Sequence, residues 1–122
     1  MDLLPTCLEL AGVDYPSTFN EKQTTSMDGK SLIPLIQEKI STTHDTLYWE
    51  HVGGRAVRIG DWKMSALRRG DWELFDLSVD PTEINNLAEE QPERYESMNA
   101  LWEEWATRVK LAEQTGGIGG RR

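Results

Sequence analysis

A chain of 122 residues is long enough for one domain with a modest core and too short for two. Its hydrophobic fraction of 38% with five Trp excludes a wholly disordered chain. The net charge of −8 argues against nucleic acid or an anionic membrane as the main partner, because neither would attract the chain electrostatically. No apolar run approaches the roughly 18 residues that a membrane-spanning helix needs, so no membrane span is expected.

The first expected element is a short helix over residues 3–11. Asp2 can cap its start, and Gly12 suits the position just after its end. The helix is apolar nearly all round and needs burial on most sides, so we expect an exposed apolar patch here or self-association through it. Cys7 is expected to be a buried, inert thiol, because it lies at helical spacing among apolar residues of this segment. A single cysteine forms neither an internal disulfide nor a zinc site.

Residues 13–31 are polar and turn-rich and predict a mobile loop, and residues 31–36 predict a short apolar turn or helix. From residue 46 the pattern becomes strand-like, with aromatic and β-branched runs separated by turn signals at residues 53–54, 60–61, 68–71 and 80–81. Short connections make neighbouring strands antiparallel. The middle third therefore predicts a three- or four-stranded meander.

A longer helix is expected from Pro92, since proline suits the first helical position. Apolar residues recur there at steps of three and four and should lie across one face of the sheet; they are Tyr95, Met98, Leu101, Trp102, Trp105, Ala106 and Val109. The expected fold class is α+β: a small antiparallel three- to four-stranded meander packed on a long C-terminal helix, preceded by a short N-terminal helix and a loop. The glycine-rich residues 114–122 predict a frayed tail.

The sequence shows no self-contained active site. His44 and His51 match no metal-binding spacing, and no nucleophile–base pair can be named. Four tryptophans are expected in the core, on the helix stripe or beneath it: Trp62, Trp72, Trp102 and Trp105. Trp49 differs, because it neighbours His51 and the Gly53-Gly54 pair. It either reaches a ligand or marks a solvated strand end.

Four segments carry a resemblance to a known family. Residues 2–12 resemble the DLLPTLLDLAG helix of arylsulfatases, and residues 28–35 are similar to their DGxSLxPLL segment. Residues 48–63 resemble the YWEHxGxRAVRxGDWK hairpin of these enzymes, and residues 72–88 resemble their WELYDLxxDPxExxNLA run. The four motifs follow the family's order across most of the chain. The chain is thereby identified as similar to the C-terminal region of an arylsulfatase with an alkaline-phosphatase-like fold.

This resemblance implies a division of the chain and the role of each part. Residues 1–45 would be a helix and linker at the edge of a missing N-terminal catalytic domain, and residues 46–113 the sulfatase C-terminal subdomain, with the flexible tail after them. Calcium and formylglycine are implied for the intact enzyme. Cys7 lies outside the family's Cys/Ser-x-Pro/Ala-x-Arg motif, and the calcium ligands have no counterpart here. We therefore expect neither cofactor in this chain and no sulfatase activity from it alone.

The resemblance also implies partners and site residues. The catalytic domain would be one partner, and a sulfated small molecule or sugar would be bound by the intact enzyme, which would be periplasmic or exported. The family's hairpin lies near the mouth of the active site, which implies that His51 and Arg55 bind substrate as one wall of the pocket. The alternative is that Arg55 merely begins a strand and His51 is solvated. The competing interpretation of the whole chain is a stand-alone binding or interaction module derived from this subdomain.

Overall fold

The computed structural model describes residues 1–68, 70–109 and 111, so the expected tail at residues 114–122 lies outside the described residues. The chain divides into two compact units, Met1–Asp45 and a second that begins at Thr46. Each unit is described by itself. Within the described ranges, no helix combines the length and the apolar character that crossing a bilayer demands.

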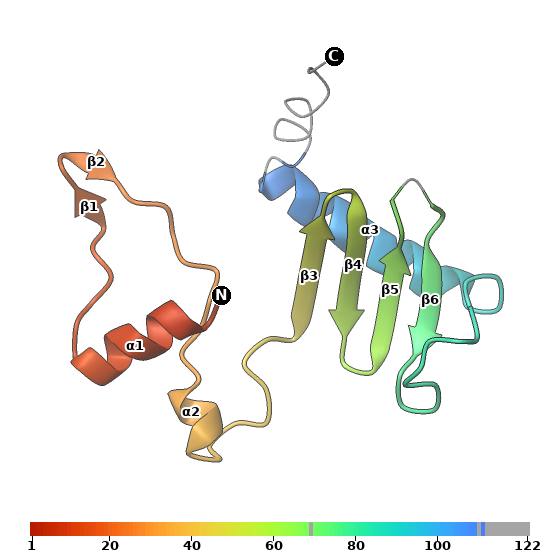
Figure 1. The fold of residues 1–122 in the computed structure, drawn as a ribbon, viewed down its shortest axis with the longest axis horizontal. Coiled ribbons are helices and arrows are strands. Elements are labelled where there is room, and N and C mark those ends of the chain that lie inside the picture. The colour runs from red at the N-terminus through yellow and green to blue at the C-terminus, as the bar shows by residue number, and fades with distance from the viewer. Residues whose placement is uncertain (69, 110, 112–122) are drawn as a thin grey trace. The chain divides into compact units, whose positions relative to one another are not determined.

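The second unit contains a four-stranded antiparallel sheet made of consecutive strands, in the spatial order β3-β4-β5-β6 (Figure 1). Its strands are β3 (Thr46–His51), β4 (Gly54–Ile59), β5 (Trp62–Ala66) and β6 (Glu73–Asp76). Helix α3 (Pro92–Arg108) runs across one face of this sheet (Figure 1). The expected α+β class is confirmed, with four strands in the meander and a helix that begins at Pro92.

The core of this unit lies between the sheet and α3. One cross-strand row contains Tyr48, Val57, Met64 and Leu74, and the last three have no exposed surface. From α3, a stripe of buried side chains closes over this row: Met98, Trp102 and Ala106. The predicted apolar stripe is confirmed at these positions, and Trp105 beside them is half-buried and stacks on Tyr48 with ring centroids 5.2 Å apart.

Two tight turns set the register of the sheet. Gly60 and Asp61 connect β4 to β5 as predicted, and Gly60 takes a φ of 57°, which glycine adopts without steric penalty. The turn between β3 and β4 is Val52–Gly53 instead of the expected Gly53–Gly54, with φ of 53° and 85°. Positive φ at both positions suits the right-handed twist of a hairpin. Gly54 therefore begins β4 and pairs with His51.

The first unit begins with α1 (Leu3–Ala11), which ends at Gly12 in a left-handed conformation, as predicted. The expected loop over residues 13–31 contains a small hairpin, with β1 (Thr18–Phe19) paired to β2 (Lys22–Gln23). Two-residue strands are too short to produce an alternating pattern, which explains why the sequence did not predict them. The short helix α2 (Ile33–Ile36) follows at the predicted place.

Asp2 holds the first unit together instead of capping α1. Its side chain makes no cap hydrogen bond, because Oδ1 accepts the backbone N–H of Lys30 at 3.0 Å and lies 2.8 Å from Nε2 of His44. Partial burial alone would raise the pKa of Asp2, but the hydrogen bonds with His44 and Lys30 lower it on balance. The predicted cap is therefore wrong, and the carboxylate joins three distant segments.

A second bond reinforces this junction one helical turn later. Thr6, the buried residue of α1, accepts the backbone N–H of Leu32 at its Oγ1 at 2.9 Å. Gly29 allows the close approach, because a Cβ there would lie 2.4 Å from the carbonyl oxygen of Met1. The segments at residues 2–12 and 28–35, which resemble two separate family motifs, therefore form one structural unit.

The opposite surface of α1 is open. Cys7 is exposed, so its predicted burial is wrong. Leu3 and Leu10 are 74% and 72% exposed. The physical reason is that α1 is held in this unit by its polar side, through Asp2 and Thr6, while its apolar residues have little to pack against.

Candidate functional site

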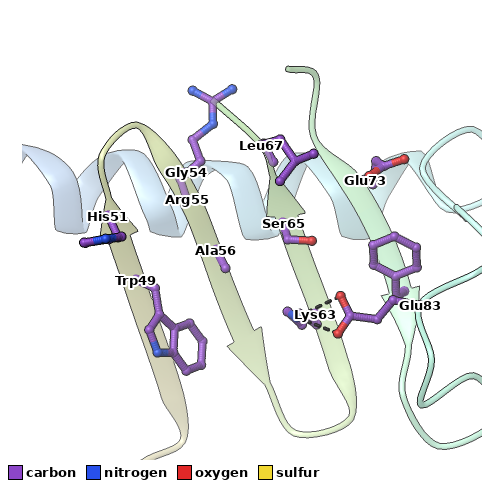
Figure 2. A pocket seen from close by; sticks show the side chains of 12 residues that line it. Trp49, His51, Gly54, Arg55, Ala56, Lys63, Ser65, Leu67, Glu73 and Glu83 are labelled. Carbon is purple, nitrogen blue, oxygen red and sulfur yellow. Dashed lines mark hydrogen bonds and ion pairs between the residues drawn. The ribbon is translucent and has the colours of Figure 1, made fainter. Parts of the chain in front are cut away.

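The face of the sheet opposite α3, called the open face below, carries the accessible polar and aromatic side chains. Strand alternation places Trp49, Ala56, Ser65 and Glu73 there in one cross-strand row, because the neighbouring row faces α3. A hollow of about 500 Å³ lies over this face (Figure 2). Six of the side chains that line it carry polar or aromatic groups accessible from this face or its edge: Trp49, His51, Arg55, Lys63, Ser65 and Glu83.

Trp49 and His51 lie on the same face because they are two residues apart in β3. Trp49 is 46% exposed, and His51, the last residue of the strand, is also exposed. The other four tryptophans pack on the α3 side, as predicted: Trp72 and Trp102 are buried, while Trp62 and Trp105 pack against the core cluster. Trp49 is thus a large aromatic side chain that lies outside the core cluster.

A side-chain hydrogen bond stabilises the β3–β4 turn, which follows His51. Oε1 of Glu50 accepts the backbone N–H of Gly53 at 2.8 Å. Val52 takes a φ of 53°, which is uncommon for a β-branched residue. Gly53 lies over the side chain of Arg68, whose Cγ would be 3.0 Å from an added Cβ. This turn is fixed by its surroundings, and it presents His51 at the edge of the hollow.

Arg55 belongs to the other face of the sheet, although it borders the hollow from the start of β4. Arg55 and Val57 are two residues apart in β4, so their side chains point to the same face, and Val57 is buried toward α3. Its guanidinium lies 4.6 Å from the ring centroid of Trp72 and 5.7 Å from that of Trp102, and it donates to the carbonyl of Gly70 at 3.3 Å. Its Nε is buried and has no hydrogen-bond partner among the described residues.

The two residues expected to bind substrate therefore border the same hollow from opposite faces of the sheet. Figure 2 shows His51 beside β3 and the side chain of Arg55 extending beyond the end of the sheet. His51 is available to a ligand on the open face. The guanidinium of Arg55 is already engaged with two indole rings and a carbonyl group. Substrate binding stays a prediction for both, and the structure gives Arg55 a packing role as well.

An ion pair that sequence reasoning missed crosses the open face. Nζ of Lys63 lies 2.6 and 2.8 Å from the two carboxylate oxygens of Glu83 (Figure 2). Their side chains are 26% and 30% exposed. Lys63 ends the GDWK stretch and Glu83 belongs to the DPTE stretch. Both segments were singled out as family-like, but no pattern in the sequence indicated that they meet.

Glu83 is positioned by a turn that Asp80 organises. The buried carboxylate of Asp80 accepts the backbone N–H groups of Ile84 and Asn85 at 2.9 and 2.8 Å and the hydroxyl of Thr82 at 3.2 Å. The hydrogen bond from Asn85 is the largest cause that lowers the pKa of Asp80, and the bonds from Ile84 and Thr82 add to it, against a smaller opposing effect of burial. The ionised carboxylate therefore stabilises the turn.

We expect Asp80→Asn to lower stability at neutral pH and to reduce the loss of stability in acid. Because the folded pKa lies below the ordinary value of 3.8, the contribution of Asp80 is fully present above that value and is lost as pH falls through the lowered pKa. Urea unfolding at several pH values between about 7 and about 2 measures this difference. The exposed Asp71 provides a matched control for the substitution itself, since Asp71→Asn at the surface should change stability at neutral pH by less than about 0.5 kcal/mol. Parallel acid curves for the Asp80 variant and the parent protein would contradict the assignment.

The described residues do not fit the cofactors of a sulfatase centre. Cys7 lies on α1 with Glu9 and Ala11 at the positions where the formylglycine motif needs Pro or Ala and Arg. In the part of the chain that the structure describes, no three His, Cys, Asp or Glu side chains gather as metal ligands. What the site offers is binding chemistry: an exposed indole, an imidazole and a partly exposed ion pair.

The sheet of β3 to β6 with α3 across one face forms a small antiparallel α+β domain. The model of the family described as N-sulphoglucosamine sulphohydrolase, C-terminal, matches residues 1–110, and the chain belongs to this family. The resemblance to arylsulfatases is thereby confirmed.

Curated relatives support the same family. The chain is 37% identical over 112 residues to an uncharacterised sulfatase of Schizosaccharomyces pombe, covering 86% of this chain and 20% of the relative. It is 33% identical over 107 residues to an arylsulfatase of Clostridium perfringens, covering 82% and 21%. A choline-sulfatase of Rhizobium meliloti is 32% identical over 95 residues, covering 73% and 17%. The chain thus spans about a fifth of the length of these relatives.

A solved structure extends the comparison to the fold. A protein in complex with its substrate D-glucosamine-2-N,6-O-disulfate matches with a TM-score of 0.66 and 25% identity, covering 89% of this chain and 24% of that one. The arrangement of the sheet and α3 is thus shared with a protein whose structure contains a sulfated sugar.

Proposed function

We propose that this domain is the C-terminal subdomain of a sulfuric ester hydrolase and forms one wall of its substrate pocket. The observation that carries the proposal is the family match over residues 1–110 together with the accessible side chains on the open face. A catalytic domain carrying formylglycine and calcium is the partner in this proposal. These groups would supply the nucleophile and the Lewis acid that cleavage of a sulfate ester requires.

The residues of this domain would bind and orient the substrate, without taking part in bond cleavage. The imidazole of His51 is exposed at a turn that Glu50 holds in place, so it can form a hydrogen bond with a sulfate oxygen or a hydroxyl group. A hydrogen-bonding group at the pocket wall contributes by limiting the orientations of the bound substrate. A sulfated sugar or small molecule is the substrate class we favour, because choline-sulfatase and the protein bound to glucosamine disulfate are among the relatives.

An experiment on the natural polypeptide tests this function. An antibody against the domain is used to isolate that polypeptide, and calcium-dependent hydrolysis of 4-nitrophenyl sulfate is measured on it and on the purified 122-residue chain. We expect sulfatase activity in the antibody-isolated protein and none in the chain alone, because the nucleophile and the metal ligands belong to the partner domain.

The same experiment separates the proposal from its alternative. Turnover by the 122-residue chain that remains proportional to this protein through purification would show that the chain is itself an enzyme. An antibody-isolated polypeptide of about the same length as this chain, without sulfatase activity, would instead show a stand-alone binding module. Either result would overturn the proposal.

A further inference from the structure

The exposed position of Trp49 is not explained by packing of the core. Burial of an indole removes a large apolar surface from water and is normally favourable. The other four tryptophans lie on the α3 side, yet Trp49 is 46% exposed on the open face. Its backbone is fixed, since the carbonyl of Trp49 accepts the indole N–H of Trp102 at 3.3 Å. The ring is thus presented to the surface from a well-anchored strand.

The neighbours of Trp49 leave room above the sheet. Across the strands its row continues with Ala56 and Ser65, whose side chains are short. Trp49 borders the hollow of about 500 Å³ and also a second hollow of about 370 Å³. Figure 2 shows the indole of Trp49 beside β3 and the short side chain of Ala56 on the neighbouring strand. Among the described residues, the ring contacts that the structure shows involve the other tryptophans, which leaves the indole of Trp49 available to a flat ligand.

Polar groups stand across the sheet from the ring, with β4 between the strand of Trp49 and the strand of Lys63. Lys63 and Glu83 border both hollows with Trp49, and their ion pair is partly exposed. An ammonium group donates hydrogen bonds and a carboxylate accepts them, so the pair matches hydroxyl groups, which do both. Arg58 adds a cation to the second hollow. An aromatic surface with a few polar groups at its rim is the usual composition of a small-molecule site.

We propose that Trp49 is a stacking platform for the pyranose ring of a sulfated sugar, with Lys63 and Glu83 binding the ring hydroxyls. The apolar C–H face of a pyranose would cover the indole, and the hydroxyls at the ring edge would reach the ion pair. The substrate class rests on the proposed function. The platform itself is built from β3, β5 and the turn at residues 80–85, which all belong to the second unit of this chain.

The platform is tested by titrating the 122-residue chain with D-glucosamine-2-N,6-O-disulfate while recording the five indole N–H resonances. We expect the Trp49 resonance to shift and those of the buried Trp72 and Trp102 to stay in place. Trp49→Ala should weaken binding about tenfold, whereas Trp49→Phe, which keeps an aromatic face, should weaken it about threefold or less. Val79→Ala, at a position that is 79% exposed and away from the hollow, should leave binding unchanged.

Three results would overturn the platform. The first is absence of saturable binding to the chain, and the second is binding that Trp49→Ala leaves unchanged. The third concerns the antibody-isolated polypeptide: if Trp49 is shielded there from a soluble quencher in the absence of sugar, another protein surface covers the open face. Sulfatase activity measured in parallel decides the proposed function separately, because loss of the stacking site leaves the nucleophile and the metal untouched.

Discussion

Trp102→Ala should destabilise the second unit by about 3–5 kcal/mol, the range for removing a buried aromatic side chain from a core. Trp102 is 7% exposed and meets Trp72 in an edge-on contact with ring centroids 5.4 Å apart. Its indole N–H also donates to the carbonyl of Trp49. The substitution would therefore leave a cavity between α3 and the sheet and remove the hydrogen bond from the indole to the Trp49 carbonyl. Urea unfolding followed by near-ultraviolet circular dichroism measures the change.

Two further variants make this result interpretable. Trp102→Phe keeps most of the packed volume but loses the bond to Trp49, so it should cost less than the alanine variant and stay folded for measurement. Trp49→Ala removes a ring of the same kind from the open face and should change stability by less than about 1 kcal/mol. Equal losses from Trp49→Ala and Trp102→Ala would mean that the assignment of the two faces of the sheet is wrong.

The elements of the fold were predictable where a periodicity ran long enough. The three- and four-residue spacing after Pro92 gave α3, and alternation around Gly60 gave β4 and β5. The turn between β3 and β4 was displaced by one residue, because a Gly-Gly pair is a stronger local turn signal than Val-Gly. Register is decided instead by which residues face the core, and pairing Tyr48 with Val57 leaves Val52 in the turn.

The candidate site was less predictable, because strand pairing brings together side chains that are far apart in the sequence. Arg55 was expected beside His51, but its parity with Val57 places it toward α3. The alternation of side chains along β4 predicts this face for Arg55 if Val57 is assumed to lie in the core. Lys63 and Glu83 are twenty residues apart and meet only because Asp80 closes the turn that carries Glu83. No local pattern contains such a contact.

The exposed surface of α1 shows a different limit of sequence reasoning. A helix that is apolar on nearly every side predicts burial, and Cys7 was assigned to a core on that basis. Within the described residues the buried side chain of α1 is Thr6, whose hydroxyl holds residue 32. The hydrophobic pattern of a helix predicts that its apolar side chains are buried. It does not show whether the residues that bury them belong to the same unit.

The different positions of His51 and Arg55 lead us to expect different kinetic results for the two substitutions, measured in the longer sulfatase that we propose contains this domain. His51→Ala should lower kcat/KM for a sulfated sugar about tenfold, the loss of one hydrogen bond to a fixed donor. It should lower kcat/KM for 4-nitrophenyl sulfate much less, because a small ester does not reach a remote wall. Stability should not change, since His51 is exposed at the end of β3.

Arg55→Ala should behave differently, because its guanidinium packs on Trp72 and Trp102 and donates to the carbonyl of Gly70. We expect lower stability and similar losses of kcat/KM on both substrates, in proportion to the unfolded fraction. Arg55→Lys keeps the charge but loses the planar group that stacks on an indole, so it should restore little of the stability. If Arg55→Ala left the unfolding curve unchanged and lowered kcat/KM for the sugar alone, Arg55 would be a direct substrate contact and its packing role would be minor. A loss confined to the sugar for His51 and shared by both substrates for Arg55 would place the pocket wall on the open face of the sheet.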